Sequence, residues 1–362
     1  MRNRLVRLGI SLSWGLAAGL SWGASEGGVV PQSKVSELVG EPNPAQPVGE
    51  VDPAQEVNRL YRELRQVGLV LGGRHRLPLP PPTMPDGLDA ASQRAILEAL
   101  PNRNQTVEQF ARKSVVSPFA MRFRDYPAVE GLDPIHGIDV WFVAHGSLEA
   151  LTDPAFFAPP PHRQGGEEEL GSAKARVLSP SQLKARGVAS SDLDTGRERV
   201  ALVNLRLFDK VELNVAGQSI WTQTPAGDPA AARPTTPSSL TVAARIDRRF
   251  DHDPQSPNHW RPILRQGGRE IVGDPRTYTD AAWYYKVTPL VEPPGALFIE
   301  AHLVYVEPKD WFQGANLLRS KLPIVIQSEI RAFRKRLDLH DQARRNPTTV
   351  PSDTTARVRA NR

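Results

Sequence analysis

Residues 278–337 read as two strands followed by a long amphipathic helix, and this stretch most constrains the fold. Trp283–Val287 is rich in aromatic and β-branched residues, and Leu297–Val306 is a second, longer apolar run. Both patterns are typical of strands. Between them, Glu292–Gly295 combines proline, which fixes φ, with glycine, which permits positive φ. A short turn joins antiparallel strands, so we expect an antiparallel pair here.

The helix that follows carries an apolar stripe. Its members recur at spacings of mostly three and four: Leu318, Leu322, Val325, Ile326, Ile330, Phe333 and Leu337. Such a stripe must be buried against another element, and the preceding strands supply one. The prediction is therefore an α+β fold, with an antiparallel β-sheet packed on a long C-terminal α-helix. N-terminal helices and a proline-rich strap complete it.

Further strands are expected in the middle of the chain. Partial alternation places Val203, Leu205 and Leu207 on one strand face, with Asn204 and Arg206 on the other. The segment Ile263–Val272 is a weaker candidate. The clearer candidates are Ile138–Ala144, Val200–Leu207, Lys210–Val215, Gln218–Thr224 and Leu240–Ile246.

The extension before residue 137 is expected to be helical, with one proline-rich interruption. Ala54–Leu71 has an amphipathic pattern, Asp89 can cap a helix that reaches Leu100, and Thr106 opens a capping box. Leu77–Pro85 contains five prolines, which favour polyproline II. We expect this segment, the proline strap, to lie on the body, although it could instead be a ligand for a proline-reading partner.

Five regions follow along the chain. Residues 1–25 resemble a signal peptide, with three arginines before an apolar run and small residues at the cleavage position near Ser25. An uncleaved anchor is the alternative, but the run is short and rich in glycine. A flexible linker (26–53), a helical and proline-rich extension (54–136), an α+β domain (137–340) and a disordered basic tail (341–362) complete the chain.

Charge and cysteine content bear on the compartment. The net charge is +5, but residues 1–25 contribute three arginines, and the basic residues after 330 lie at the other end. The body between is mildly acidic, which argues against a nucleic-acid partner. The chain has no cysteine, so it has neither disulfides nor a thiolate metal site. We expect an exported bacterial protein, periplasmic or extracellular, with no membrane span after cleavage of the signal.

Motif searches indicate neither an enzyme nor a cofactor. The sequence contains no P-loop, dinucleotide fingerprint, nucleophile elbow or zincin motif. The strongest cluster is Asp247, Asp251, His252, Asp253 and His259, which could in principle hold a metal. Prolines and serines interleave with these residues, so we interpret them as turn formers and predict no metal site.

From Gly137 to Leu337, the order of elements resembles the START-like helix-grip architecture. The order is strand, two short helices, antiparallel strands and a last helix, and Tyr305–Phe312 turns from strand into helix. The resemblance implies a helix closed over a curved sheet, often with an apolar ligand between them. No residue motif carries it, so no functional residues are transferred. The Pro225–Pro237 loop and Pro323 depart from the pattern.

Candidate ligand-contacting residues follow from this architecture, with plain core as the alternative interpretation. His302 is interpreted as a satisfied structural histidine and not as a base. The basic residues Arg331, Arg334, Lys335 and Arg336 are interpreted as a solvated helix end, with contact to anionic lipid as the alternative. The pocket candidates are Trp141, Trp283, Tyr285, Phe298, Ile326 and Phe333.

Two functions remain open at this point. The first is an exported non-enzymatic protein that binds an apolar or amphipathic ligand between the sheet and the helix. The second is a structural or protein-interaction component of the bacterial envelope without a ligand pocket. A pocket of a few hundred Å3 lined by the aromatic residues would favour the first function, and a filled core would favour the second.

Overall fold

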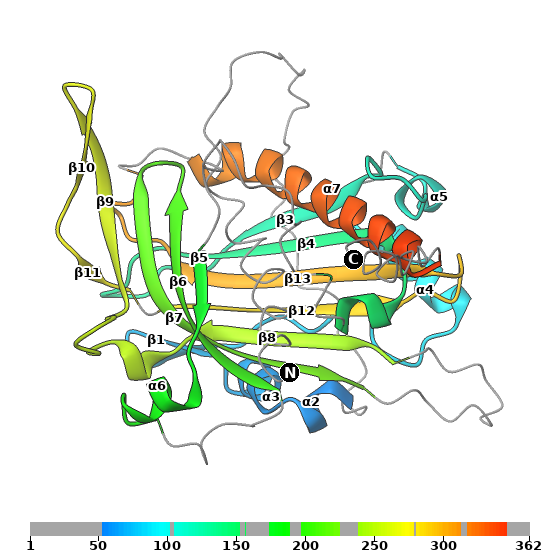
Figure 1. Ribbon diagram of the computed structural model, residues 1–362. Helices are drawn as coiled ribbons and strands as arrows, with labels where there is room; N and C mark the ends of the chain where they lie inside the picture. Colours follow the sequence, from blue (N-terminus) through cyan, green and yellow to red (C-terminus); the bar gives the residue numbers. More distant parts are fainter. Residues whose placement is uncertain are drawn as a thin grey trace, which may run out of the picture.

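A computed structural model describes residues 53–101, 105–152, 156, 174–188, 197–224, 238–278, 280–312 and 317–345. The predicted signal peptide lies outside these ranges, as do nearly all of the predicted linker and the Pro225–Pro237 loop. Within them the fold is mixed α+β, with an eleven-stranded antiparallel sheet and a long C-terminal helix against one face (Figure 1). The predicted fold class is confirmed.

The main sheet curves through the whole molecule. Its strands run in the order β10-β9-β7-β8-β12-β13-β4-β3, while β11 pairs with β9, and β6 joins β5 to β7. Its strands are β3 (Phe119–Asp125), β4 (Ile135–His145), β5 (Lys174–Val177), β6 (Glu198–Leu207), β7 (Val211–Gln223), β8 (Leu240–Ile246), β9 (His259–Gln266), β10 (Arg269–Val272), β11 (Arg276–Thr277), β12 (Ala281–Pro289) and β13 (Ala296–Val306).

Helices surround this sheet, and local caps explain where several of them begin. The described helices are α2 (Pro53–Val57), α3 (Arg59–Gln66), α4 (Ala90–Ala99), α5 (Val107–Phe110), α6 (Pro180–Lys184) and α7 (Leu317–Arg345), with 3₁₀ turns at Leu148–Thr152 and Arg248–Phe250. Asp89 accepts from the backbone of Ser92 at the start of α4, and Thr106 and Ser179 form capping boxes. These side chains satisfy amide groups that a helix start leaves without partners.

Helix α7 lies across the sheet near β3 and β4 (Figure 1). Leu322, Ile326, Ile330, Phe333 and Leu337 are buried in one cluster with the strands, as the apolar stripe predicted. Pro323 lies inside the helix, six residues after its first described residue. The ring of Phe333 meets the rings of Phe142 and Phe156 edge-on, with centroids 5.8 and 5.7 Å apart.

The opposite face of the sheet has its own core. Tyr61 and Leu64 of α3 pack on Tyr284 and Val304 there. A neighbouring cluster gathers Met84 of the strap with side chains from α4, α5, β4 and β13. The sheet is thus covered on both faces, by α7 on one and by the N-terminal extension on the other.

Several boundaries differ from the predicted ones. The first helical pattern ends at Gln66, because Leu69–Leu71 forms strand β1 and pairs with β2 (His75–Leu77). Ile263–Val272 is a hairpin and not one strand, because Gly267 and Gly268 adopt positive φ between β9 and β10.

Three further differences concern the expected domain boundary, strand β7 and the end of helix α7. The expected domain boundary at residue 137 falls inside β4, and β3 of the predicted extension is paired to that strand. The two segments 210–215 and 218–224 form the single strand β7. Helix α7 continues to Arg345, into the region predicted as tail.

Candidate functional site

Polar side chains form two rows on the sheet face opposite α7. In one row, Tyr284, His302, Asp139 and Arg122 lie in register across β12, β13, β4 and β3. In the adjacent row, Lys286 of β12 lies opposite Glu300, and Glu300 lies opposite Trp141. Side chains two residues apart on a strand point to the same face, so Glu300 and His302 are neighbours.

His302 is held between two carboxylates. Its Nδ1 lies 2.7 Å from Oδ1 of Asp139, and its Nε2 lies 3.0 Å from Oε2 of Glu300. The side chain is buried, with 1% of the residue exposed. Burial alone would lower the pKa of His302, but hydrogen bonds and charge from Asp139 and Glu300 outweigh it, and the pKa is raised. The sequence-based interpretation of a satisfied histidine agrees with these contacts.

Asp139 is the most heavily paired member of the network. Its Oδ2 accepts from Nε and Nη2 of Arg122 at 3.1 and 3.0 Å, and its Oδ1 accepts from Arg124 at 2.7 Å. Burial acts to raise the pKa of Asp139, whereas His302, Arg124 and Arg122 act to lower it. The net effect is a lowered pKa. Asp139 is therefore an ionised, fully satisfied carboxylate within the sheet.

Glu300 connects this network to the proline strap. Its Oε2 accepts from the backbone N–H of Thr83 at 2.5 Å, and its Oε1 accepts from that of Met84 at 3.1 Å. In the same row, Nε1 of Trp141 donates to Oγ1 of Thr83 at 2.8 Å. One carboxylate thus binds the amides of Thr83 and Met84, the two non-proline residues between Pro80 and Pro85.

Strap carbonyls are bound by donors from the same face. Nζ of Lys286 donates to the carbonyl of Met84 at 3.0 Å and lies 3.0 Å from Oδ1 of Asp86. The hydroxyl of Tyr284 donates to the carbonyl of Pro80 at 2.9 Å. The sheet therefore recognises an extended main chain through side chains that contact both its N–H and its C=O groups. The expectation that the strap lies on the body is met.

This network was not predicted from the sequence, although three charged residues in strand segments indicate part of it. Lys286, Glu300 and Asp139 each interrupt an otherwise apolar strand pattern. A charged residue at a buried strand position needs a partner. Alternation also places Glu300 and His302 on one face. What the local pattern lacks is the register that brings Asp139 next to His302 across 163 residues.

The six pocket candidates do not come together. Trp283, Tyr285, Ile326 and Phe333 belong to the cluster beneath α7. Trp141 and Phe298 belong to the cluster on the opposite face, with residues of the strap and α4. Strand alternation separates them, because Trp141 and Phe142 point to opposite faces of β4. Trp141 and Phe298 therefore cannot line a space between the sheet and the helix.

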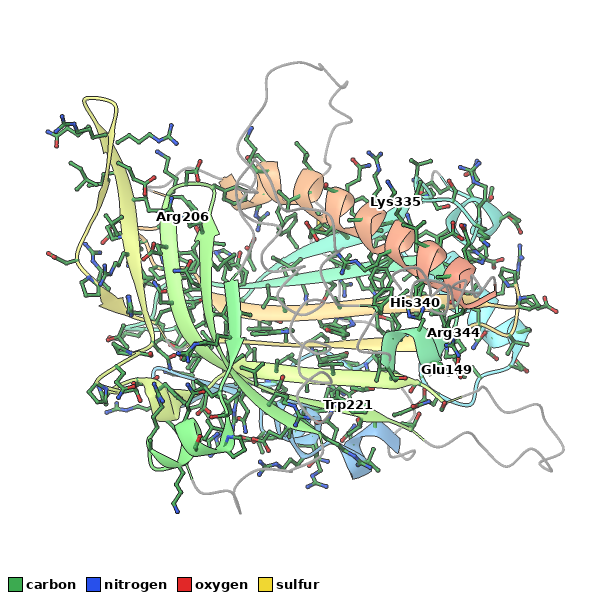
Figure 2. All side chains as sticks on the ribbon, in the orientation of Figure 1. Glu149, Arg206, Trp221, Lys335, His340 and Arg344 are labelled. Atoms are coloured by element: carbon green, nitrogen blue, oxygen red, sulfur yellow. The ribbon has the colours of Figure 1, made fainter. Side chains whose placement is uncertain are left out.

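Arg334 corrects one expectation. The sequence predicts Arg334 to be part of a solvated helix end, but only 5% of the residue is exposed. Its guanidinium donates to the carbonyls of Val143, Ser117 and Pro118 at 2.8, 2.5 and 3.0 Å. Burial, with the charge of Arg331, lowers the pKa of Arg334 to about 10. By contrast, Arg331 and Lys335 are exposed, and Lys335 points away from the sheet (Figure 2).

The acidic cluster near residue 250 is occupied by turn contacts. Asp247 caps a 3₁₀ turn, and Oδ1 of Asp253 accepts from the amides of Gln255 and Ser256 at 2.9 and 2.7 Å. Nδ1 of His259 lies 2.7 Å from the carbonyl of Pro257. Among the described residues, no group of three or more histidine and acidic side chains is placed to hold a metal ion.

An exposed hairpin lies at one end of the sheet. Strands β9 and β10 extend beyond the turn of β6 and β7, forming what we call the β9–β10 arm, residues 263–272 (Figure 1). Leu264 and Ile271 lie opposite each other on it and are 45% and 43% exposed, and Val272 is 37% exposed. Arg206 of β6 lies beside the arm (Figure 2) and donates to Glu270 at 2.8 and 3.2 Å.

No protein-family model matches this chain, and a search of curated proteins finds no match either. In the part of the chain that the structure describes, no helix is both long and apolar enough to cross a membrane.

Proposed function

We propose that this chain is an exported, non-enzymatic interaction component of a bacterial envelope, and that it contacts a protein partner through the β9–β10 arm. The exposed apolar pair on that arm carries the proposal. The export pattern in residues 1–25 supports the exported location.

The space between helix and sheet supports an interaction protein over a ligand carrier. Phe333, Phe142 and Phe156 contact one another there, and all three are buried. Side chains thus occupy the position at which a helix-grip protein would hold a ligand. The long helix across an antiparallel sheet still supports the proposed helix-grip relationship, in a form with a packed interior.

The arm has properties expected of a contact surface. Monomeric proteins usually expose apolar side chains singly, whereas Leu264 and Ile271 form an exposed cross-strand pair on one face of the arm. Arginines flank them, with Arg265 and Arg269 both exposed. Arginine is enriched at protein interfaces, and the fully buried centre of an interface is more apolar than the rest of the protein surface. The ion pair between Arg206 and Glu270 holds the arm on β6, so the surface is preformed.

Site-specific photo-crosslinking in the native host tests this function. A photoactivatable residue at position 271 should form one discrete adduct with a partner protein. Ile324, which is 64% exposed on α7, is the matched control position and should not form that adduct. A Leu264→Ser substitution should weaken the adduct from position 271. Equal labelling from both positions, or none from 271, would contradict the proposal.

Export and ligand binding are tested on the same material. Exported protein should begin near Glu26, and a mature chain that still begins at Met1 or Arg2 would contradict cleavage. Native mass spectrometry of protein purified from its host should show the mass of the polypeptide alone. A stoichiometric small molecule retained in that experiment would favour the ligand-binding alternative instead.

A further inference from the structure

The carboxylate that anchors the strap also binds a buried histidine. Oε2 of Glu300 lies 2.5 Å from the amide nitrogen of Thr83 and 3.0 Å from Nε2 of His302. A single oxygen thus joins a titratable group to a segment that covers the sheet. A change in the charge of His302 therefore acts directly on the Glu300 carboxylate, which binds the strap.

The geometry around His302 fits an imidazolium. A neutral imidazole has one N–H donor and one lone pair, whereas the protonated ring donates from both nitrogens. Both nitrogens of His302 face carboxylate oxygens, at 2.7 and 3.0 Å. With a neutral ring, one nitrogen would direct its lone pair at a carboxylate. The hydrogen bonds to both carboxylates are therefore strongest when His302 is an imidazolium.

Charged and titratable groups reach His302 from every element packed on it. From β13 and β4 come Glu300 and Asp139, and from β12 the ring of Tyr284, with centroids 4.8 Å apart. The groups one contact further away are Arg122 and Arg124 on β3, Lys286 on β12, and Asp86 beyond the strap.

Loss of the proton from His302 would affect its two carboxylate partners, Asp139 and Glu300, unequally. Asp139 retains two arginines if His302 becomes neutral. Lys286 is engaged by Asp86 and by the carbonyl of Met84. Within the described residues, the basic side chain within ion-pair distance of Glu300 is that of His302. A neutral His302 would thus leave Glu300 as a buried carboxylate with two amide donors and no cation in contact. Burying such a charge is costly unless it is paired.

We propose that His302 and Glu300 form a proton-controlled latch that holds the proline strap on the sheet. While His302 is protonated, its positive charge pairs with the Glu300 carboxylate, which binds the amides of Thr83 and Met84. When His302 loses its proton, lifting the strap lets water solvate Glu300. The strap therefore opens more often as the pH rises, and opening exposes the row of Lys286, Glu300 and Trp141.

The direction follows from linkage. The pKa of His302 is raised in the closed state, so protonation favours closure. Closure is strongest below the ordinary histidine pKa of about 6.5. It weakens as pH rises from there through the raised pKa, and opening increases by up to about tenfold per pH unit, the limit for one linked proton.

Hydrogen exchange on the full-length protein measures this opening. Residues 80, 81, 82 and 85 are prolines without an N–H, so a fragment spanning 80–85 reports the amides of Thr83 and Met84. After correction for the intrinsic dependence of exchange on pH, protection of this fragment should fall between pH 6 and pH 9. Protection that stays constant in the wild-type protein over that range would overturn the latch.

Two variants separate the latch from general pH effects. His302→Gln should remove the pH dependence of the fragment's protection, whatever its absolute level. His136→Gln is the matched control, because His136 also lies between two carboxylates, 2.8 Å from Asp125 and 3.6 Å from Glu307. It should retain the dependence. An unchanged pH profile in His302→Gln would also overturn the proposal. If that variant does not fold, the wild-type profile decides alone.

Discussion

Arg334 on α7 donates a hydrogen bond from Nε to the main-chain carbonyl of Val143 on β4, at 2.8 Å. The same guanidinium also binds the carbonyls of Ser117 and Pro118, which precede β3. One side chain thus ties the helix to a strand and to the loop before the edge strand. A charged group serves here as a structural clamp, next to the apolar stripe that buries the helix.

Removing this clamp should destabilise the fold. Arg334→Ala leaves buried carbonyls without donors, and each unsatisfied group costs about 1–3 kcal/mol. We expect a loss of about 2–4 kcal/mol in the free energy of unfolding, measured by chemical denaturation. Arg331→Ala removes the same charge from an exposed position and should change stability by no more than about 0.5 kcal/mol. Equal effects of the two variants would show that the clamp contributes nothing.

The apolar stripe should contribute through packing. Phe333→Ala removes a ring that meets Phe142 and Phe156, and we expect a loss of roughly 3–5 kcal/mol. Lys335→Ala, two positions along and exposed, should be silent within about 0.5 kcal/mol. Denaturant titration of both variants measures the difference. If both substitutions are mild, α7 does not derive its stability from this face.

Asp139 should make the protein sensitive to acid. Because its folded pKa is lowered, its contribution to stability is present above its unfolded pKa of about 3.9 and is lost as pH falls through the folded pKa. Asp139→Asn should be less stable at neutral pH and should lose less stability on acidification. Unfolding curves between pH 3 and pH 7 measure both slopes. Parallel curves for the variant and wild type would refute the assignment.

Gly68 should be required for the approach of the strap. Its φ is +88°, and an added Cβ would lie 2.5 Å from the nitrogen of Pro78. Gly73, with φ of +77° and nothing within 4 Å, is the matched control. Both alanine variants incur left-handed strain of about 1–2 kcal/mol. Gly68→Ala should cost about 1–3 kcal/mol more, because only there does the Cβ overlap main chain. Thermal or chemical unfolding of the pair tests this difference.

Elements whose signals are local could be predicted from the sequence. The stripe from Leu322 to Leu337 and the capping box at Thr106 depend on residues within a few positions of one another. The paired strands β12 and β13 are also local, because a short turn joins them. Periodicity and capping chemistry act along the chain, so these elements could be predicted before any contact was known.

The tertiary structure decided which side chains meet. Trp141 and Trp283 both lie in aromatic strand segments, yet pairing and alternation place them on opposite faces of the sheet. His302 meets Asp139 only because β13 pairs with β4 in one register, and a slip of one residue would turn every side chain over. The local sequence pattern predicts a solvated Arg334, because the carbonyls that accept its hydrogen bonds lie more than 190 residues away in the chain. Burial and partners of a charged group depend on contacts distant in the chain, which a local pattern does not contain.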